Sequence, residues 1–319
     1  MTESRNPGIS IMLSGFHRMF GPDPRHIIDA AKILDDRGVD ELLLGDHVVI
    51  GSRTDQYPYG EFAWRVDDQS GPLEEARIRP DEPWPEPLTL LTAIAAVTSR
   101  LRLGTGILIA PLRPAALLAK TAATLDVISG GRLELGVGVG WQPEEYTALG
   151  LEYADRWRLL DETMLACRRM WEDVPASYHG SSANADGIYC VPQPVQARLP
   201  VWLGAAATAA AARRIARYAD GWFPLTAWTP DTVAAGAEVI REAMAAAGRD
   251  PAELRIRVPL VLKWNRDGSL DGPATMEPAG ALAQTGVTLL WAVIGPHLEL
   301  STMSEVSAFV DQLMKATDR

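Results

Sequence analysis

The stretch RLRLGTGILIAPLRPAALLAKTAATLDVISGGRLELGVGVGW, residues 100–141, decides the fold class of this chain. Residues 101–109 are apolar and punctuated by glycine, as expected of a strand that is buried on both faces. A helix follows from Pro114, the expected first helical position, with apolar residues recurring every three or four positions until Ser129. Residues 132–138 read as a second strand. A strand, a helix and a strand within about 40 residues predict a right-handed βαβ unit, and therefore an α/β fold.

The same alternation continues on both sides of this unit. It predicts strands at 8–13, 39–47, 200–204, 220–223, 254–262 and 287–293, and helices at 27–38, 87–99, 154–172, 205–217, 232–247, 278–285 and 301–315, with a short helix starting at 143. Together these make eight strands, each with a helix, and no break in composition divides them. The pattern predicts a (β/α)8 barrel in which residues 1–319 form one domain.

Three segments interrupt the rhythm and are interpreted as insertions: residues 49–87, 174–200 and 262–278. The first is rich in proline and carries Tyr57, Tyr59, Phe62, Trp64 and Trp84. A long loop with many aromatic residues favours a packed lid over the barrel mouth. A surface excursion against the barrel flank, forming a dimer contact, is an equal alternative at this stage.

A doubly wound dinucleotide-binding fold is the weaker alternative. The G-x-G-x-x-G fingerprint fails because its third glycine would fall on Pro143 when counted from Gly138, and on Ile109 when counted from Gly104. Neither a G-x-x-x-x-G-K-[ST] loop nor a G-x-S-x-G elbow occurs in the sequence. Phosphoryl transfer and serine hydrolase chemistry are therefore unsupported.

The composition restricts the class of partner. A formal charge of −11 over 319 residues argues against nucleic acid and anionic membranes. No signal peptide and no run of about 18 apolar residues occurs, so a soluble cytoplasmic protein is expected. Cys167 and Cys190 predict buried thiols rather than a disulfide. The five histidines are scattered without metal-binding spacing, so no metal site is expected.

Asp46 and His47 follow the second predicted strand directly. A titratable pair at the carboxyl end of a barrel strand points into the mouth, where barrel enzymes bind their ligands. His47 could instead be a structural histidine that is hydrogen-bonded by Asp46. Its position immediately after Gly45 favours the functional interpretation.

Glycines mark the ends of two neighbouring strands, at residues 104–106 and 136–140. Glycine within a strand indicates a bulge or a group lying close to the backbone, although tight strand packing explains any single one equally well. Two such ends side by side favour a flat ligand. A third candidate is the junction after Gly204, where residues 205–208 open a helix whose N–H groups could bind a phosphate. A tight βα turn that binds nothing is the alternative for that junction.

These motifs resemble the bacterial-luciferase-like flavin and deazaflavin oxidoreductases, and more closely their actinobacterial branch that uses coenzyme F420. The resemblance extends from Ile9 to about Phe223. The matching runs are residues 103–111, 118–120, 123–126, 129–133, 136–141, 45–47, 153–156, 213–216 and 220–222.

The resemblance implies a luciferase-like TIM barrel with a non-prolyl cis peptide at Gly106-Ile107, which supports the middle of the tricyclic ring. It places Asp46 and His47 near the reactive face, and residues 204–208 at the phosphate. Ala205, Ala206 and Ala207 stand where relatives often carry glycine; alanine keeps the N–H but not easy access to positive φ. The implied cofactor-binding residues are Asp46, His47, Thr105, Gly106, Ile107, Ile109, Gly138, Gly140, Trp141, Gly204, Ala205, Ala206, Ala207 and Thr208.

The activity implied by the resemblance is hydride transfer between coenzyme F420 and a small organic substrate. His47 is the expected proton donor or hydrogen-bond partner, and Glu144 is a weaker second candidate. Two alternatives remain open: a luciferase-like monooxygenase that uses reduced FMN from a separate reductase, and a barrel that binds flavin or deazaflavin without turnover. Family analogy also implies a homodimer.

Overall fold

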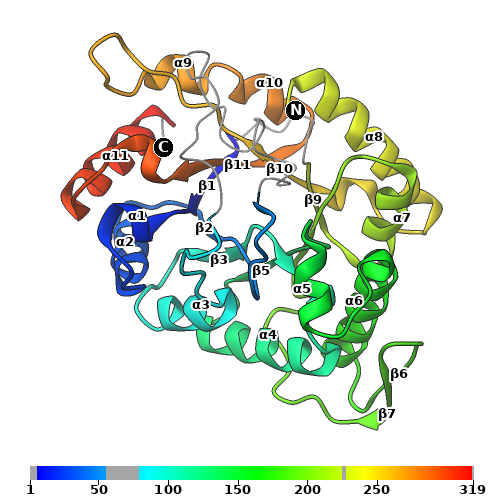
Figure 1. Ribbon diagram of the computed structural model, residues 1–319. Helices are drawn as coiled ribbons and strands as arrows, with labels where there is room; N and C mark the ends of the chain where they lie inside the picture. Colours follow the sequence, from blue (N-terminus) through cyan, green and yellow to red (C-terminus); the bar gives the residue numbers. More distant parts are fainter. Residues whose placement is uncertain (1–5, 55–78, 225–227, 318–319) are drawn as a thin grey trace.

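Parallel strands form a closed ring that is surrounded by helices in the computed structural model, which describes residues 6–54, 79–224 and 228–317 (Figure 1). Around the ring the order is β1, β2, β3, β5, β8, β9, β10 and β11, and β11 pairs with β1 again. The predicted (β/α)8 barrel is confirmed. The ring strands are β1 (Gly8–Leu13), β2 (Glu41–Leu44), β3 (Arg102–Thr105), β4 (Leu108–Ile109), β5 (Leu133–Gly138), β8 (Val201–Gly204), β9 (Gly221–Phe223), β10 (Arg255–Pro259) and β11 (Val287–Ile294).

Both faces of the ring strands are covered, which explains their continuous apolar runs. Leu42 and Leu43 follow one another in β2 and so point to opposite faces, yet each is 0% exposed. In the neighbouring strand β1, Ile11 is paired with Leu42 on one side and with Ala292 of β11 on the other. The interior of the barrel is therefore filled by side chains below its open end.

The helices lie outside the ring (Figure 1). They are α1 (Phe16–Phe20), α2 (Arg25–Asp36), α3 (Pro87–Ala95), α4 (Ala115–Ser129), α5 (Pro143–Ala148), α6 (Arg156–Glu172), α7 (Ala209–Tyr218), α8 (Pro230–Ala246), α9 (Gly272–Met276), α10 (Ala279–Gln284) and α11 (Met303–Ala316). In α4, Pro114 is the N-cap residue rather than the first helical one, and Gly130 ends the helix at φ 67°. None of the helices in the described ranges is both long and apolar enough to cross a membrane.

The strand predicted at residues 101–109 is divided in two. β3 ends at Thr105, and β4 resumes at Leu108 after the non-prolyl cis peptide Gly106-Ile107, which is present as the resemblance implied. Before the break the chain pairs with β2, and the Gly106 N–H donates to the Leu44 carbonyl at 2.8 Å. After the break it pairs only with β5 among the described strands. The result is a bulge at the carboxyl end of the strand.

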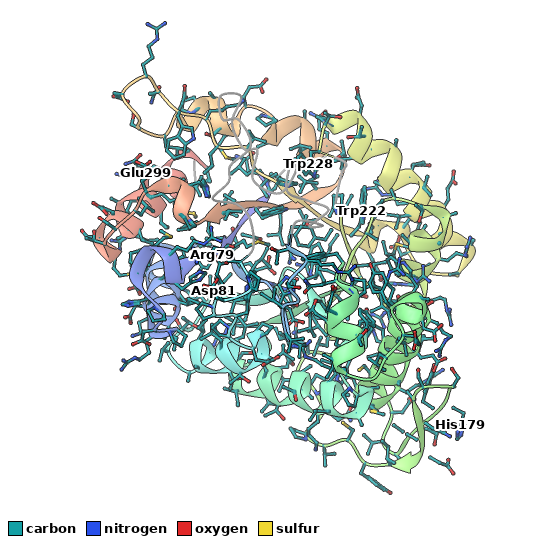
Figure 2. All side chains as sticks on the ribbon, in the orientation of Figure 1. Arg79, Asp81, His179, Trp222, Trp228 and Glu299 are labelled. Carbon is teal, nitrogen blue, oxygen red and sulfur yellow. The ribbon has the colours of Figure 1, made fainter. Side chains whose placement is uncertain are left out.

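A hairpin occupies part of the segment at 174–200 that we expected to be irregular. It consists of the antiparallel strands β6 (Ala176–His179) and β7 (Asn184–Ile188), which lie away from the ring (Figure 1). The sequence signal is weak because the strands are only four and five residues long and β7 has no regular apolar alternation. His179 lies at the periphery of the molecule and hydrogen-bonds Asn184, so it is remote from the barrel mouth (Figure 2).

Glu162 of α6 fastens this hairpin. Its carboxylate accepts hydrogen bonds from the Ser181 and Ser182 hydroxyls, each at 2.6 Å. Burial would raise the pKa of Glu162, but these hydrogen bonds lower it from 4.5 to about 2. The stabilisation is therefore complete above the ordinary pKa and is lost as the pH falls toward the folded-state value.

We expect the stability difference between wild type and Glu162→Gln to shrink with acidification. Urea unfolding at several pH values between about 6 and 3 would measure it, because glutamine cannot titrate in this range. The gap should be constant above about pH 5 and narrow below that value. A gap that is the same at every pH would contradict the assigned role of the carboxylate.

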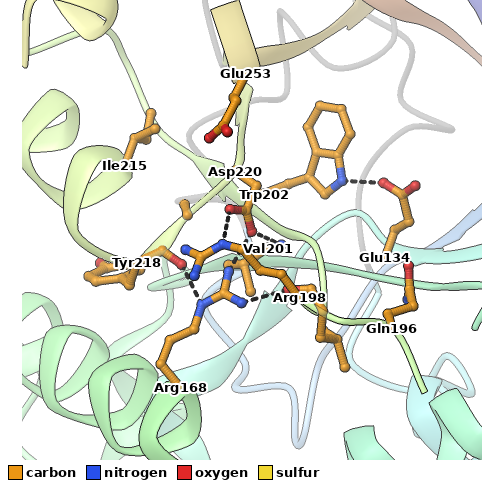
Figure 3. A network of polar contacts seen from close by, with 12 residues as sticks. Glu134, Arg168, Gln196, Arg198, Val201, Trp202, Ile215, Tyr218, Asp220 and Glu253 are labelled. Carbon is orange, nitrogen blue, oxygen red and sulfur yellow. Dashed lines mark hydrogen bonds and ion pairs between the residues drawn. The ribbon is translucent and has the colours of Figure 1, made fainter. Parts of the chain in front are cut away.

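A second network of polar contacts lies at the amino-terminal ends of β8 and β9, opposite the barrel mouth. The Asp220 carboxylate accepts hydrogen bonds from Arg168 at 2.5 Å, from Arg198 at 2.6 Å and from the Val201 N–H at 3.0 Å (Figure 3). Burial would raise the pKa of Asp220, but the charges of Arg168 and Arg198 hold it below its ordinary value. The network ties α6 to the start of β8 and of β9, far from the barrel mouth.

Candidate active site

The carboxyl ends of the ring strands open into a cavity of about 370 Å³. Leu13, Leu44, Gly138, Gly204 and Phe223, each the last residue of its strand, line it. Aromatic side chains make up part of the walls. The aromatic lining residues are Phe16, Trp84, Trp141, Trp157, Phe223, Trp228 and Trp291, with His17, His47 and His297 among them.

The floor of this cavity is the bulge at Gly106-Ile107, and the glycines around it make room for its side chains. A Cβ added to Gly138 would lie 2.8 Å from Ile107 Cδ1, and one added to Gly204 would lie 2.8 Å from Ile107 Cγ2. A Cβ added to Gly140, whose φ is 65°, would lie 2.9 Å from Ile109 Cδ1. These glycines therefore leave the space that the Ile107 and Ile109 side chains occupy. Ile107 also lines the cavity.

Asp46 anchors the bulge to the end of β2. One of its oxygens, Oδ2, accepts from the Ile109 N–H at 2.8 Å and from Arg113 Nη1 at 2.7 Å. The other, Oδ1, accepts from Arg113 Nη2 at 2.9 Å. Burial would lower the pKa of Arg113, but its bond to Asp46 raises it. The suggestion that Asp46 hydrogen-bonds His47 is wrong, because the described hydrogen bonds of the Asp46 carboxylate go to Arg113 and Ile109, and His47 Nδ1 contacts Glu145.

His47 meets a different carboxylate, Glu145 of α5. His47 Nδ1 lies 3.2 Å from Glu145 Oε2, and the neighbouring Val48 N–H donates to Glu145 Oε1 at 3.0 Å. The Trp84 ring packs edge-on against the imidazole, with ring centroids 4.8 Å apart. His47 is thus buried, oriented from two sides, and part of the cavity wall.

Glu144, the second acid–base candidate, does not line the cavity. Its carboxylate pairs with Arg53 at 2.5 Å and is partly exposed. Successive residues on a helix point about 100° apart, so in α5 Glu145 faces the barrel while Glu144 faces outward. The carboxylate that contacts His47 is therefore Glu145 and not Glu144, and two consecutive glutamates in a sequence offer no means of choosing between them.

The other implied cofactor residues divide into two groups. Gly106, Ile107, Ile109, Gly138, Gly140, Trp141 and Gly204 line the cavity with Asp46 and His47. Thr105 does not: it is fully buried, and its hydroxyl donates to the Gly136 carbonyl at 2.6 Å. Residues 205–208 lie beyond the lining, next to Gly204.

The turn at 205–208 is already partly satisfied by the protein. The Ala205 N–H donates to the Phe223 carbonyl at 3.2 Å, and the Ala205 carbonyl accepts from Trp222 Nε1 at 2.9 Å. Thr208 is the N-cap of α7 and accepts from the Ala211 N–H at 3.2 Å. Between them, no hydrogen bond to a described residue engages the N–H groups of Ala206 and Ala207. The positive end of α7 and these two groups are what this junction offers an anion.

The predicted lid falls mostly outside the described residues. Tyr57, Tyr59, Phe62 and Trp64 are all outside them, and only the last aromatic of the segment, Trp84, can be placed. Trp84 lines the cavity beside His47. Sequence reasoning did not single out Arg113, Glu145 or Trp291, because nothing in their local pattern distinguishes a site residue from a core or surface residue.

Two buried indole N–H groups in the cavity wall have no acceptor among the described residues: Trp84 Nε1 and Trp291 Nε1. A buried donor without a partner is costly, so such groups in a cavity wall suit a ligand that carries acceptor atoms. Carbonyl oxygens on a flat heterocycle have this chemistry.

Comparisons with known proteins agree with this arrangement. The family model of the luciferase-like monooxygenases matches residues 8–268. An uncharacterised protein of Mycobacterium tuberculosis is 36% identical over 177 residues, which span 56% of this chain and only 61% of that protein. Among solved structures, the monooxygenase RslO1 from Streptomyces bottropensis superposes with a TM-score of 0.72 at 17% identity, covering 97% of this chain and 98% of RslO1.

A second solved structure, an F420-dependent secondary alcohol dehydrogenase in complex with an F420-acetone adduct, gives a TM-score of 0.68 at 15% identity, covering 98% of this chain and 99% of the other. At such identities these two likenesses show a common fold. The family model goes further, because it covers most of the chain and every ring strand except β11. This chain therefore belongs to the luciferase-like monooxygenase family.

Proposed function

We propose that this protein is a coenzyme F420-dependent oxidoreductase, which transfers a hydride between the deazaflavin and a small organic substrate. The observation that carries the proposal is the position of His47, a buried acid–base group in the wall of a cavity that several tryptophans and the Gly106-Ile107 bulge also line. Hydride transfer between carbon atoms is commonly accompanied by a proton transfer, for which histidine is the side chain best suited near neutral pH.

The residues present fit such a cofactor. Ile107 and the aromatic walls offer an apolar surface to a flat ring, and Trp84 and Trp291 offer N–H donors to its carbonyl oxygens. The start of α7, next to Gly204, would hold the phosphate. When bound, a deazaflavin supplies a carbon that accepts or donates hydride. The protein's part is to orient the substrate over that carbon and to move a proton through His47.

Members of this family use either F420 or reduced FMN, so the cofactor is the first thing to test. We expect purified protein to bind F420 at least roughly tenfold more tightly than FMN, a difference of about 1.4 kcal/mol. Quenching of tryptophan fluorescence would report binding, because Trp84, Trp141, Trp157, Trp228 and Trp291 all line the cavity. Tighter binding of FMN, or oxygen consumption with reduced FMN and a reductase, would overturn the F420 assignment.

A monooxygenase that uses reduced FMN is the second candidate. Two observations support it: the family that matches this chain is named for monooxygenases, and the fold is similar to that of the monooxygenase RslO1. The oxygen-uptake measurement separates the two candidates. A third possibility, binding without turnover, would be supported if His47→Ala altered no turnover while cofactor binding stayed intact.

A further inference from the structure

Glu145 is a fully buried carboxylate that binds the loop after β2 at two consecutive residues. Its Oε1 accepts the Val48 N–H at 3.0 Å, and its Oε2 lies 3.2 Å from His47 Nδ1. The Glu145 side chain is 0% exposed, and that of His47 is 7% exposed. The contact is therefore an interior one. It involves His47, the side chain of the cavity wall on which the proposed function depends.

The neighbouring Asp46 makes no hydrogen bond to His47 among the described contacts. Both of its oxygens are engaged, by Arg113 and by the Ile109 N–H. Arg113 in turn also pairs with Glu86 at 2.9 Å. Among the described residues, Glu145 is thus the carboxylate that faces the imidazole of His47.

The chemistry of the two groups decides which nitrogen carries the proton. An ionised carboxylate only accepts hydrogen bonds, so with Glu145 ionised Nδ1 is the donor in this contact. A neutral imidazole has a single N–H, and its other nitrogen is then an acceptor. With Nδ1 turned to Glu145, which does not line the cavity, the Nε2 edge of the ring is the one left for the cavity wall.

We propose that Glu145 is a positioning residue that fixes His47 in the Nδ1–H tautomer. Neutral His47 then presents the Nε2 lone pair to the cavity as a proton acceptor, and Glu145 stabilises the imidazolium that forms when the proton arrives. The same proton is returned from Nε2 in the reverse direction. The use of this proton rests on the proposed function, whereas the tautomer is a property of the protein alone.

The contact with Val48 makes Glu145→Gln an informative variant. A backbone N–H can only donate, so the carbonyl oxygen of the introduced amide should stay on Val48, and the NH2 group of that amide should face His47. Nδ1 must then become the acceptor, and the proton moves to Nε2. Glu144→Gln makes the same chemical change one residue away, at the carboxylate that pairs with Arg53, and serves as the matched control.

Long-range ¹H–¹⁵N correlation spectra of the histidine rings distinguish the two tautomers. The chain has five histidines, and the His47 signals are identified by their absence in His47→Gln. Spectra are recorded without cofactor at about pH 8.5, where histidines are ordinarily neutral. We expect the Nδ1–H pattern for His47 in the wild type and in Glu144→Gln, and the Nε2–H pattern in Glu145→Gln.

Two results would overturn the proposal: an Nε2–H pattern for His47 in the wild type, or an unchanged Nδ1–H pattern in Glu145→Gln. Should Glu145→Gln fail to fold, the wild-type spectrum alone still decides, because an Nε2–H tautomer is incompatible with a contact between Nδ1 and ionised Glu145. Failure of F420 to bind would refute the proposed function and leave the tautomer untouched, so the two hypotheses fail separately.

Discussion

Replacing Arg257 by methionine is expected to lower the free energy of unfolding by about 3 to 5 kcal/mol. Arg257 of β10 and Glu41 of β2 are both 0% exposed, and Arg257 Nη2 lies 2.5 Å from Glu41 Oε1. Without the guanidinium, Glu41 would keep a hydrogen bond from Ser10 Oγ at 2.6 Å and the longer-range attraction of Arg102 and Arg255. The loss is large because a carboxylate would stay buried in the barrel without the one cation that is hydrogen-bonded to it among the described residues.

The charge on Arg257 is itself costly to bury. Burial lowers its pKa to about 10, although the charge of Glu41 opposes that shift. Its Nε and Nη1 atoms have no acceptor among the described residues. The faces of Trp202 and Phe223, with centroids 4.2 and 5.3 Å from Cζ, contribute cation–π attraction. Glu41 is therefore the main compensation for this buried cation.

The double variant Glu41→Leu/Arg257→Met is the informative partner of the single one. Replacing both charges by apolar groups removes the unpaired carboxylate, so we expect most of the lost stability to return. Urea unfolding followed by tryptophan fluorescence would measure both variants. A loss below about 1 kcal/mol for the single variant, or a double variant less stable than the single one, would show that the pair does not behave as a buried ion pair.

Replacing Gly136 by alanine is expected to cost at least about 3 kcal/mol, or to prevent folding. The added Cβ would lie 2.0 Å from the Thr105 backbone oxygen, and backbone cannot move aside as a flexible side chain can. Thr105 is further held because its hydroxyl donates to the Gly136 carbonyl. Since Thr105 is the residue before the bulge, any relaxation would also displace the Gly106-Ile107 floor of the cavity.

Gly280→Ala provides the matched control for this overpacking. Gly280 is exposed in α10, and nothing lies within 4 Å of the position of an added Cβ. Alanine is the better helix former, so a gain of about 0.5 to 1 kcal/mol is expected there. Thermal unfolding followed by circular dichroism would compare the two variants. If Gly136→Ala unfolded within a few degrees of the wild type, the close approach of β5 to β3 would be in error.

The barrel could be predicted because its signals are local. The apolar run at 101–109, the three- and four-residue spacing of the helix after Pro114, and the glycines that end it each depend on neighbours a few residues away. The same local logic placed Asp46 and His47 after a strand, and hence at the barrel mouth, where His47 lies. The hairpin in the segment at 174–200 was missed because its strands are only four and five residues long and the second has no regular apolar alternation.

By itself, then, the sequence determined two things: the order of the eight strands and their helices, and the end of the barrel at which a ligand would bind. Both could be predicted because periodicity and strand ends depend on residues that are close together in the chain. Only the tertiary structure decided which groups meet. Asp46 pairs with Arg113, 67 positions away, and Arg257 with Glu41, 216 positions away. The choice of Glu145 over Glu144 depended on the rotation of one short helix against the ring. Such pairings follow from closing the barrel, which brings distant strands together and fixes the direction of each side chain, and no local pattern encodes that.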